Sequence, residues 1–200
     1  MAVNTYRINE IFYSLQGEGR HTGRAAVFVR FSGCNLACSF CDTDFRSYTL
    51  MTAEDILAAV TPWASCAFVV LTGGEPSLQV DVPLVEALHE AGFYVAMETN
   101  GTHPVPQQVD WVTWSPKDCF VEHVPAMALE RVNEIKVVFD GKIDPERYAH
   151  IADGALLYLQ PCDTGNAHRN AVIVQQCVEY IKQHPHWCLS LQTHKLIQIP

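Results

Sequence analysis

Short apolar segments alternate with helix-like segments along this chain of 200 residues, and that alternation constrains its fold more than any other feature. Segments rich in β-branched and aromatic side chains predict strands over residues 25–31, 66–71, 93–98, 111–114, 134–139, 155–159 and 187–191. Apolar spacing and capping side chains predict helices over residues 52–60, 81–91 and 170–183. Strands that alternate with helices pair in parallel through crossover connections, so we expect an α/β fold with a mostly parallel sheet.

The number of predicted strands limits how the sheet can close. Seven strands are too few for a closed eight-stranded barrel of roughly 250 residues, so we expect an open, barrel-like sheet. A chain of this length suits a single domain over residues 1–200, and no linker or low-complexity segment divides it. Nearly every predicted strand is followed by Gly, Thr, Ser, Asn, Lys or Gln. Ligands bind at the carboxyl edge of parallel strands, so the site is expected there.

Composition excludes several classes of protein. With 48% hydrophobic and 18% charged residues, the chain is globular rather than disordered. Its longest apolar run, Cys66–Leu71, is far shorter than the roughly 18 residues of a membrane helix. No signal peptide opens the chain, so we expect a cytoplasmic protein with no membrane partner. The net charge of -9 argues against nucleic acid as the main partner.

Three of the eight cysteines, Cys34, Cys38 and Cys41, form a dense cluster with the spacing C-x3-C-x2-C. Thiolates are soft ligands that bind zinc, copper(I) or iron–sulfur clusters. Structural zinc usually takes four ligands, and no Cys or His follows within the next twenty residues. The spacing favours a 4Fe–4S cluster with one iron open to a small molecule. A non-catalytic zinc-binding or electron-carrier module remains an alternative.

The remaining cysteines are scattered along the chain. Free Cys is commonly buried as a small hydrophobic residue, so we expect most of them to be structural. Cys162 is the least certain, because it follows a predicted strand at the ligand-binding edge. The set comprises Cys66, Cys119, Cys162, Cys177 and Cys188.

The cysteine loop, with Phe40 before its last Cys, resembles the radical S-adenosylmethionine (SAM) superfamily. Further motifs make the resemblance narrower, to the 7-carboxy-7-deazaguanine synthase family, and they run from residue 11 to the C-terminus. These motifs are Ile11–Gly19, Val29–Cys34, Cys41-Asp42-Thr43, Leu71–Pro76, Glu98–Thr102, Ser115–Lys117 and Gln192–Lys195. The resemblance implies an incomplete (β/α)6-type open barrel.

The resemblance also implies an activity. Cys34, Cys38 and Cys41 would hold the cluster, whose open iron binds SAM and whose electron generates a 5′-deoxyadenosyl radical. The enzyme would convert 6-carboxy-5,6,7,8-tetrahydropterin to 7-carboxy-7-deazaguanine by hydrogen abstraction at C6, ring contraction and loss of ammonia, in the route to queuosine. It would use Mg²⁺, an electron donor such as flavodoxin or ferredoxin, and a homodimeric assembly. No side chain is assigned as a nucleophile or acid–base catalyst.

Residues near the predicted strand ends would hold SAM. Gly74 lacks a Cβ and allows close approach, and Glu75 can accept hydrogen bonds from an ammonium group, although a plain Gly-Gly turn is the alternative. Phe40 would shield the adenine side. The implied SAM-binding set is Phe40, Asp42, Gly74, Glu75, Ser115, Pro116, Lys117, Gln160, Pro161, Cys162 and Asp163.

Another set would bind the pterin. Gln16 and Glu18 offer donors and acceptors for its amide and amino edge, and Arg30 offers two donors to its carboxylate. Thr43 is the implied magnesium ligand, while Asp42 could instead cap the loop. The implied substrate-binding set is Leu15, Gln16, Gly17, Glu18, Arg30, Thr72, His194 and the carboxylate of Pro200.

A second enzyme class shares the cysteine loop and a similar length. In that class, a radical SAM activase places a glycyl radical on a partner protein. Such an activase has no need for Arg30, Thr43 and His194 around a small ligand. Binding of a pterin without a protein partner therefore discriminates the two activities.

Overall fold

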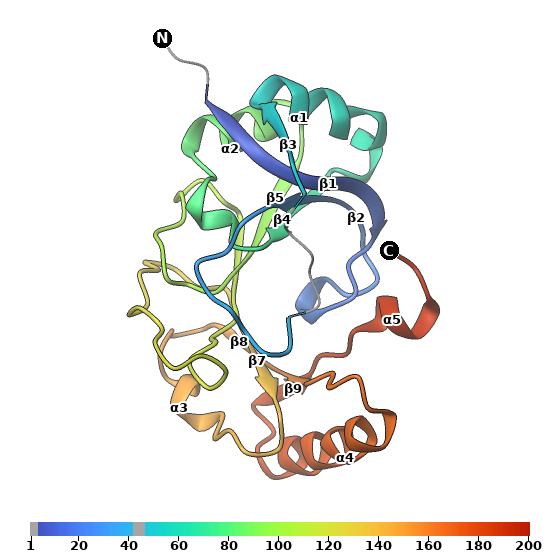
Figure 1. The fold of residues 1–200 in the computed structure, drawn as a ribbon, viewed down its shortest axis with the longest axis vertical. Coiled ribbons are helices and arrows are strands. Elements are labelled where there is room, and N and C mark those ends of the chain that lie inside the picture. The colour runs from blue at the N-terminus through green and yellow to red at the C-terminus, as the bar shows by residue number, and fades with distance from the viewer. Residues whose placement is uncertain (1–3, 42–46) are drawn as a thin grey trace.

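One mixed sheet of nine strands forms the frame of the computed structural model, which describes residues 4–41 and 47–200 (Figure 1). Its strands are β1 (Thr5–Leu15), β2 (Ala25–Phe31), β3 (Thr49–Thr52), β4 (Phe68–Gly73), β5 (Tyr94–Thr99), β6 (Trp111–Trp114), β7 (Glu134–Phe139), β8 (Leu156–Pro161) and β9 (Trp187–Leu189). They lie in the order β3-β1-β2-β4-β5-β6-β7-β8-β9. From β2 to β9 every described pairing is parallel, which confirms the predicted α/β class and mostly parallel, open sheet.

The first edge of the sheet differs from the prediction. Strand β1 pairs antiparallel with both β2 and β3, and neither β1 nor β3 is predicted from the sequence. The register of β1 shifts between Ile8 and Glu10, which interrupts the alternation that reveals a strand. Strand β3 has only four residues, two of them exposed, so its pattern is equally weak.

Five helices are described, of which the first four pack on the outer face of the sheet and the last contributes His194 to the cleft. They are α1 (Ala53–Val60), α2 (Val82–Glu90), α3 (Glu146–Ala149), α4 (Ala167–Gln183) and α5 (Thr193–Ile197), with short 3-10 turns η1 (Gly19–His21), η2 (Thr61–Cys66) and η3 (Pro76–Leu78). The predicted capping box of α1 is present, since Thr52 and Asp55 exchange hydrogen bonds. Helix α4 begins three residues before the predicted start because the Asn166 side chain caps it. Residues 100–110 and 115–133, all described, connect parallel strands without a helix.

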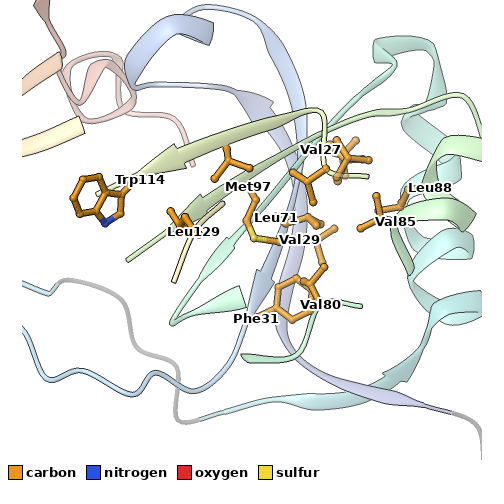
Figure 2. Packing of buried hydrophobic residues seen from close by; sticks show 14 of the residues in the cluster. Val27, Val29, Phe31, Leu71, Val80, Val85, Leu88, Met97, Trp114 and Leu129 are labelled. Atoms are coloured by element: carbon orange, nitrogen blue, oxygen red, sulfur yellow. The ribbon is translucent and has the colours of Figure 1, made fainter. Parts of the chain in front are cut away.

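Both faces of the central strands are buried, as expected for a parallel sheet. On the outer face, alternate residues of β2, β4 and β5, including Val29 and Leu71, form one buried cluster with Leu88 of α2 (Figure 2). On the inner face a second cluster contains Phe28 and Val70, near the middle of their strands. The next inner-face residues toward the carboxyl ends are polar: Arg30, Thr72 and Glu98. The sheet thus changes from apolar to polar along its inner face.

The scattered cysteines only partly match the expected burial. Cys162 and Cys177 are buried, whereas Cys119 and Cys188 are exposed. Cys66 is half-buried at the end of η2 rather than inside a strand, because Ala67 adopts a left-handed conformation with φ 49° and β4 begins only at Phe68. Among the described residues, no helix combines the length and apolar character that crossing a membrane requires.

Candidate active site

A cleft of about 750 Å³ opens at the carboxyl ends of the parallel strands. The structure brings most of the predicted site residues to its walls, from segments far apart in the sequence. They are Leu15, Gln16, Gly17, Glu18, Arg30, Cys34, Cys38, Phe40, Cys41, Thr72, Gly74, Glu75, Ser115, Lys117, Gln160, His194 and Pro200. Asp42 and Thr43 lie outside the described residues.

The three clustered cysteines follow β2 on one loop and all line this cleft. Each is a free thiol; Cys34 and Cys38 are half-buried and Cys41 is exposed. Burial raises the pKa of the Cys34 and Cys38 thiols, while the nearby Lys117 ammonium opposes that rise at both. A cation beside thiols that must deprotonate to bind metal is favourable.

The donor set of this loop fits an iron–sulfur cluster. Among the described residues, no three His, Cys, Asp or Glu side chains converge closely enough to hold a single metal ion. A 4Fe–4S cluster does not require such convergence, because each thiolate binds a different iron atom. Three thiols spaced along one loop at the mouth of a cleft can each bind a separate iron atom, and therefore fit such a cluster.

The backbone around Gly74 lies directly against the start of the cysteine loop. Gly74 donates to the Phe31 carbonyl at 3.0 Å, and the Glu75 N–H donates to the Gly33 carbonyl at 2.9 Å. A Cβ on Gly74 would stand 2.0 Å from the Gly33 oxygen, so only glycine fits there. The contact fixes the cysteine loop relative to β4 and excludes a mere surface turn at Gly73-Gly74.

The carboxylate of Glu75 lines the cleft but is more enclosed than its sequence prediction implies. The sequence predicts an acceptor open to an ammonium group, but this side chain is only 1% exposed. Its oxygens already accept from the Ser77 N–H and hydroxyl, the Thr99 hydroxyl and the Asn100 N–H. Three of these donors bind Oε1 and one binds Oε2, so Oε2 keeps an acceptor direction at a residue that lines the cleft. Glu75 ties the glycine loop to the end of β5.

Lys117 also lines the first cleft. Its ammonium donates to the Ser115 hydroxyl and lies 5.5 Å from the centre of the Phe40 ring. Burial, with the nearby Lys136 charge, lowers the pKa of Lys117. Pro116 between these residues is buried, and it lines neither this cleft nor the second cleft, which adjoins it.

A second cleft of about 820 Å³ adjoins the first, and Phe40 and Cys41 line both. Cys162 and Asp163 open into this second cleft, whereas Gln160 faces the first and Pro161 lines neither. Hydrogen bonds from the Gly165 N–H, Lys195 and Asn170 lower the pKa of Asp163 to about 2. The predicted SAM-binding residues are therefore divided between two connected spaces.

Gln16 and Glu18, which also line the first cleft, belong to a closed ring of hydrogen bonds. Lys136 donates to Glu18 Oε2 at 2.6 Å and to Glu98 Oε2 at 2.7 Å. Gln16 Nε2 donates to Glu98 Oε1 at 3.3 Å, and the Glu18 N–H donates to Gln16 Oε1 at 3.1 Å. Gln192 adds a donor to Glu18 Oε1 at 3.0 Å. Together with Gln192, the ring joins four segments of the chain.

Glu98 and Lys136 are absent from the sequence prediction. The sequence did hold a signal for them. Glu134 and Lys136 stand at alternate positions of the predicted strand Glu134–Phe139, and Glu98 ends the predicted strand Phe93–Glu98. A charge within an apolar strand is rarely left unpaired, so it points to a buried polar partner.

The remaining predicted residues lie around the cleft mouth. Arg30 Nε pairs with Glu10 at 2.7 Å, and Arg30 stands in register with Thr72 across the β2–β4 pairing. The C-terminal segment folds back onto β1, where the Ser14 hydroxyl donates to the Pro200 oxygen at 2.9 Å (Figure 1). His194 packs against Gly17, where a Cβ would stand 2.2 Å from its Nδ1.

Comparisons with known proteins agree with this geometry. Residues 28–112 match the model of the Radical SAM superfamily. The chain is 50% identical over 193 residues to the 7-carboxy-7-deazaguanine synthase of Bacteroides thetaiotaomicron, covering 96% of this chain and 98% of the relative. It is 44% identical to that of Bordetella pertussis, covering 98% and 99%. The crystal structure of QueE from Escherichia coli aligns with a TM-score of 0.80 at 30% identity, covering 94% of this chain and 93% of that chain.

Glu134 gives a pH-dependent prediction. Burial, reinforced by Glu98, raises its pKa to about 7 from the usual 4.5. As pH rises, this carboxyl group ionises at a lower pH in the unfolded chain than in the folded protein. The stability that it contributes is therefore complete below about pH 4.5. That stability is lost as pH rises toward 7, by on the order of 3 kcal/mol. Glu134→Gln cannot ionise, so its thermal midpoint relative to the unaltered protein should improve between pH 5 and pH 8. Parallel pH profiles would contradict this assignment.

Proposed function

The chain belongs to the 7-carboxy-7-deazaguanine synthase family of radical SAM enzymes, and on that basis we propose how its residues convert 6-carboxy-5,6,7,8-tetrahydropterin to 7-carboxy-7-deazaguanine. The 4Fe–4S cluster and SAM are the cofactors of this superfamily, and the reaction is a step in queuosine biosynthesis. Substrate and product differ by one ammonia, so hydrogen abstracted from C6 must be returned. One observation carries the proposal: three thiols, the glycine loop and a ring of polar side chains share one cleft.

Cys34, Cys38 and Cys41 would hold the cluster. When bound, the reduced cluster supplies the electron that cleaves SAM to methionine and a 5′-deoxyadenosyl radical. The contact between Gly33 and the Gly74 segment supports this placement, because it seats the cysteine loop against the wall where SAM would lie.

For SAM, we propose that the Gly74 backbone and Ser115, Lys117 and Gln160 bind the methionyl and ribose parts in the first cleft. Cys162 and Asp163 would contact the remainder in the second cleft, with Phe40 between the two spaces. Asp42, Pro116 and Pro161 remain in the proposed set as flanking residues. Glu75 would hold the Gly74 segment through Oε1 and offer the remaining acceptor direction of Oε2 to the methionyl ammonium group.

For the pterin, Gln16 and Glu18 would accept and donate hydrogen bonds at the amide and amino edge. Arg30 would bind the carboxylate, and Leu15, Gly17, Thr72, His194 and the Pro200 carboxylate would complete the site. We propose that the chain's residues work by orienting the substrate and excluding water, since effective alignment removes much of the entropic cost of reaction.

Family membership also supports proposals for the metal ion, the assembly, the reductant and the cellular location of the enzyme. We propose that Thr43 binds Mg²⁺ next to the substrate carboxylate, consistent with the preference of Mg²⁺ for few protein oxygens. The enzyme would act as a cytoplasmic homodimer reduced by flavodoxin or ferredoxin, without nucleic acid. The continuous nine-stranded sheet supports one domain over residues 1–200. Relatives named as synthases over nearly the whole chain favour this activity over a glycyl-radical activase or a zinc module.

The direct test is an anaerobic incubation of the reconstituted protein with SAM, a reductant, Mg²⁺ and 6-carboxytetrahydropterin. Mass spectrometry should find a product lighter than the substrate by one ammonia, with the retention time of 7-carboxy-7-deazaguanine. Cleavage of SAM without any change in the pterin would contradict the proposed substrate.

The cluster ligands give a second prediction. Cys38→Ala should abolish cluster assembly, measured as bound iron and sulfide, while circular dichroism remains close to that of the unaltered protein. Cys188→Ala, at an exposed position of β9, should retain the full cluster content. Undiminished iron and SAM cleavage in Cys38→Ala would remove Cys38 from the ligand set.

The close backbone contact gives a third prediction. Gly74→Ala places a Cβ against the Gly33 carbonyl, so SAM affinity should fall at least tenfold by calorimetry on the reconstituted protein. The matched control is Gly23→Ala, which has a positive φ of 84° but open space around the added Cβ. Equal SAM affinity in the two variants would show that the contact does not position SAM.

A further inference from the structure

Lys136 is the central cation of the ring formed with Gln16, Glu18 and Glu98. Its residue is 4% exposed, and its ammonium donates to both carboxylates at 2.6 and 2.7 Å. The two carboxylates come from different segments, the loop after β1 and strand β5. One lysine on β7 therefore sets the relative position of two acidic side chains in the cleft wall.

The carboxylates of the ring differ from Glu75 in their remaining hydrogen-bonding capacity. Glu75 accepts from four protein donors. Glu18 accepts from Lys136 and Gln192, and Glu98 accepts from Lys136 and Gln16. With about four acceptor directions per carboxylate, both ring members keep acceptor directions for a ligand. Both line the cleft, so those directions are available to N–H groups there.

Without the lysine, this arrangement would not stay ionised. Glu18 and Glu98 are half-buried carboxylates that share one lysine, and without its charge their mutual repulsion favours protonation of one of them. A protonated carboxyl becomes a donor and presents the wrong group to an N–H edge. Burial raises the pKa of Glu18, but the Lys136 ammonium outweighs that effect and lowers it to about 2.

We propose that Lys136 is a positioning residue of the pterin site, which keeps Glu18 and Glu98 as paired acceptors for the N–H groups of the pyrimidine edge. This inference rests on the proposed function. The ring has one positive and two negative charges, so it disfavours the substrate carboxylate and attracts N–H donors. Arg30 lies on β2, with three strands between it and β7, and lines the same cleft with the opposite charge. The two groups together give the pterin one orientation.

Other charged groups also face the ring. They come from β7, from the segment after β6 and from the C-terminal helix α5, and are Glu134, Lys117 and His194. Lys136 is the member that donates to both ring carboxylates, so its removal is the specific test.

Binding of 6-carboxytetrahydropterin to the reconstituted, SAM-loaded protein is measured by calorimetry between pH 5.5 and pH 8.5. The unaltered protein should show no loss of affinity from Glu18 protonation in this range. Lys136→Met should bind at least tenfold more weakly at pH 6, and the deficit should narrow as pH rises and the carboxylates ionise. Lys136→Arg should restore the unaltered pH profile, because it retains the charge.

Two further variants make the result decisive. The double variant Lys136→Met/Glu98→Gln keeps the net charge of the ring and leaves Glu18 as its one carboxylate. If Lys136→Met does not fold, this variant still tests whether Glu18 without the lysine binds the pterin in a pH-dependent way. Its affinity should also rise with pH. Lys182→Met, which removes an exposed partner of Glu179 on α4, should leave binding unchanged.

The outcomes separate this inference from the proposed function. If the unaltered protein binds the pterin but both Lys136→Met and the double variant keep its pH profile, Lys136 has only a structural role and the inference is overturned. If the unaltered protein binds no pterin at any pH, the proposed function fails and the inference fails with it.

Discussion

The contact between the Gly33 carbonyl and the Gly74 segment is the constraint on which the site depends. It joins the cysteine loop after β2 to the glycine loop after β4 through backbone atoms alone. Because no side chain intervenes, the separation of the two loops is set by the parallel pairing of β2 and β4 beneath them. Any cluster on the three thiols is thereby placed at a fixed distance from the end of the sheet.

The carboxylates of the cleft show how one residue type serves two purposes. Glu75 is surrounded by four protein donors and holds two loops together. Glu18 and Glu98 share one lysine and keep acceptor directions toward the cleft. The difference lies in the local supply of protein donors, four at Glu75 and two each at Glu18 and Glu98.

Sequence patterns predicted the parallel strands, the capped helices and the cysteine cluster, because each of these follows from local spacing. They did not predict β1, whose bulge near Glu10 interrupts the alternation. They also did not predict that Glu75 is enclosed by four protein donors or that Lys136 bridges two carboxylates. Those facts depend on which strands are neighbours, and residues 18, 98 and 136 meet only after the sheet has formed. The motif Gln16-Gly17-Glu18-Gly19 was readable, whereas its partners were not.

Arg30 and the Lys136 ring line one cleft with opposite net charges, and we propose that together they orient the pterin. The most direct test is an anaerobic crystal structure of the reconstituted enzyme with SAM and 6-carboxytetrahydropterin. The account predicts the pyrimidine N–H edge against Glu18 and Glu98, and the substrate carboxylate on the Arg30 side. A pterin bound in the reverse orientation, or outside this cleft, would contradict it.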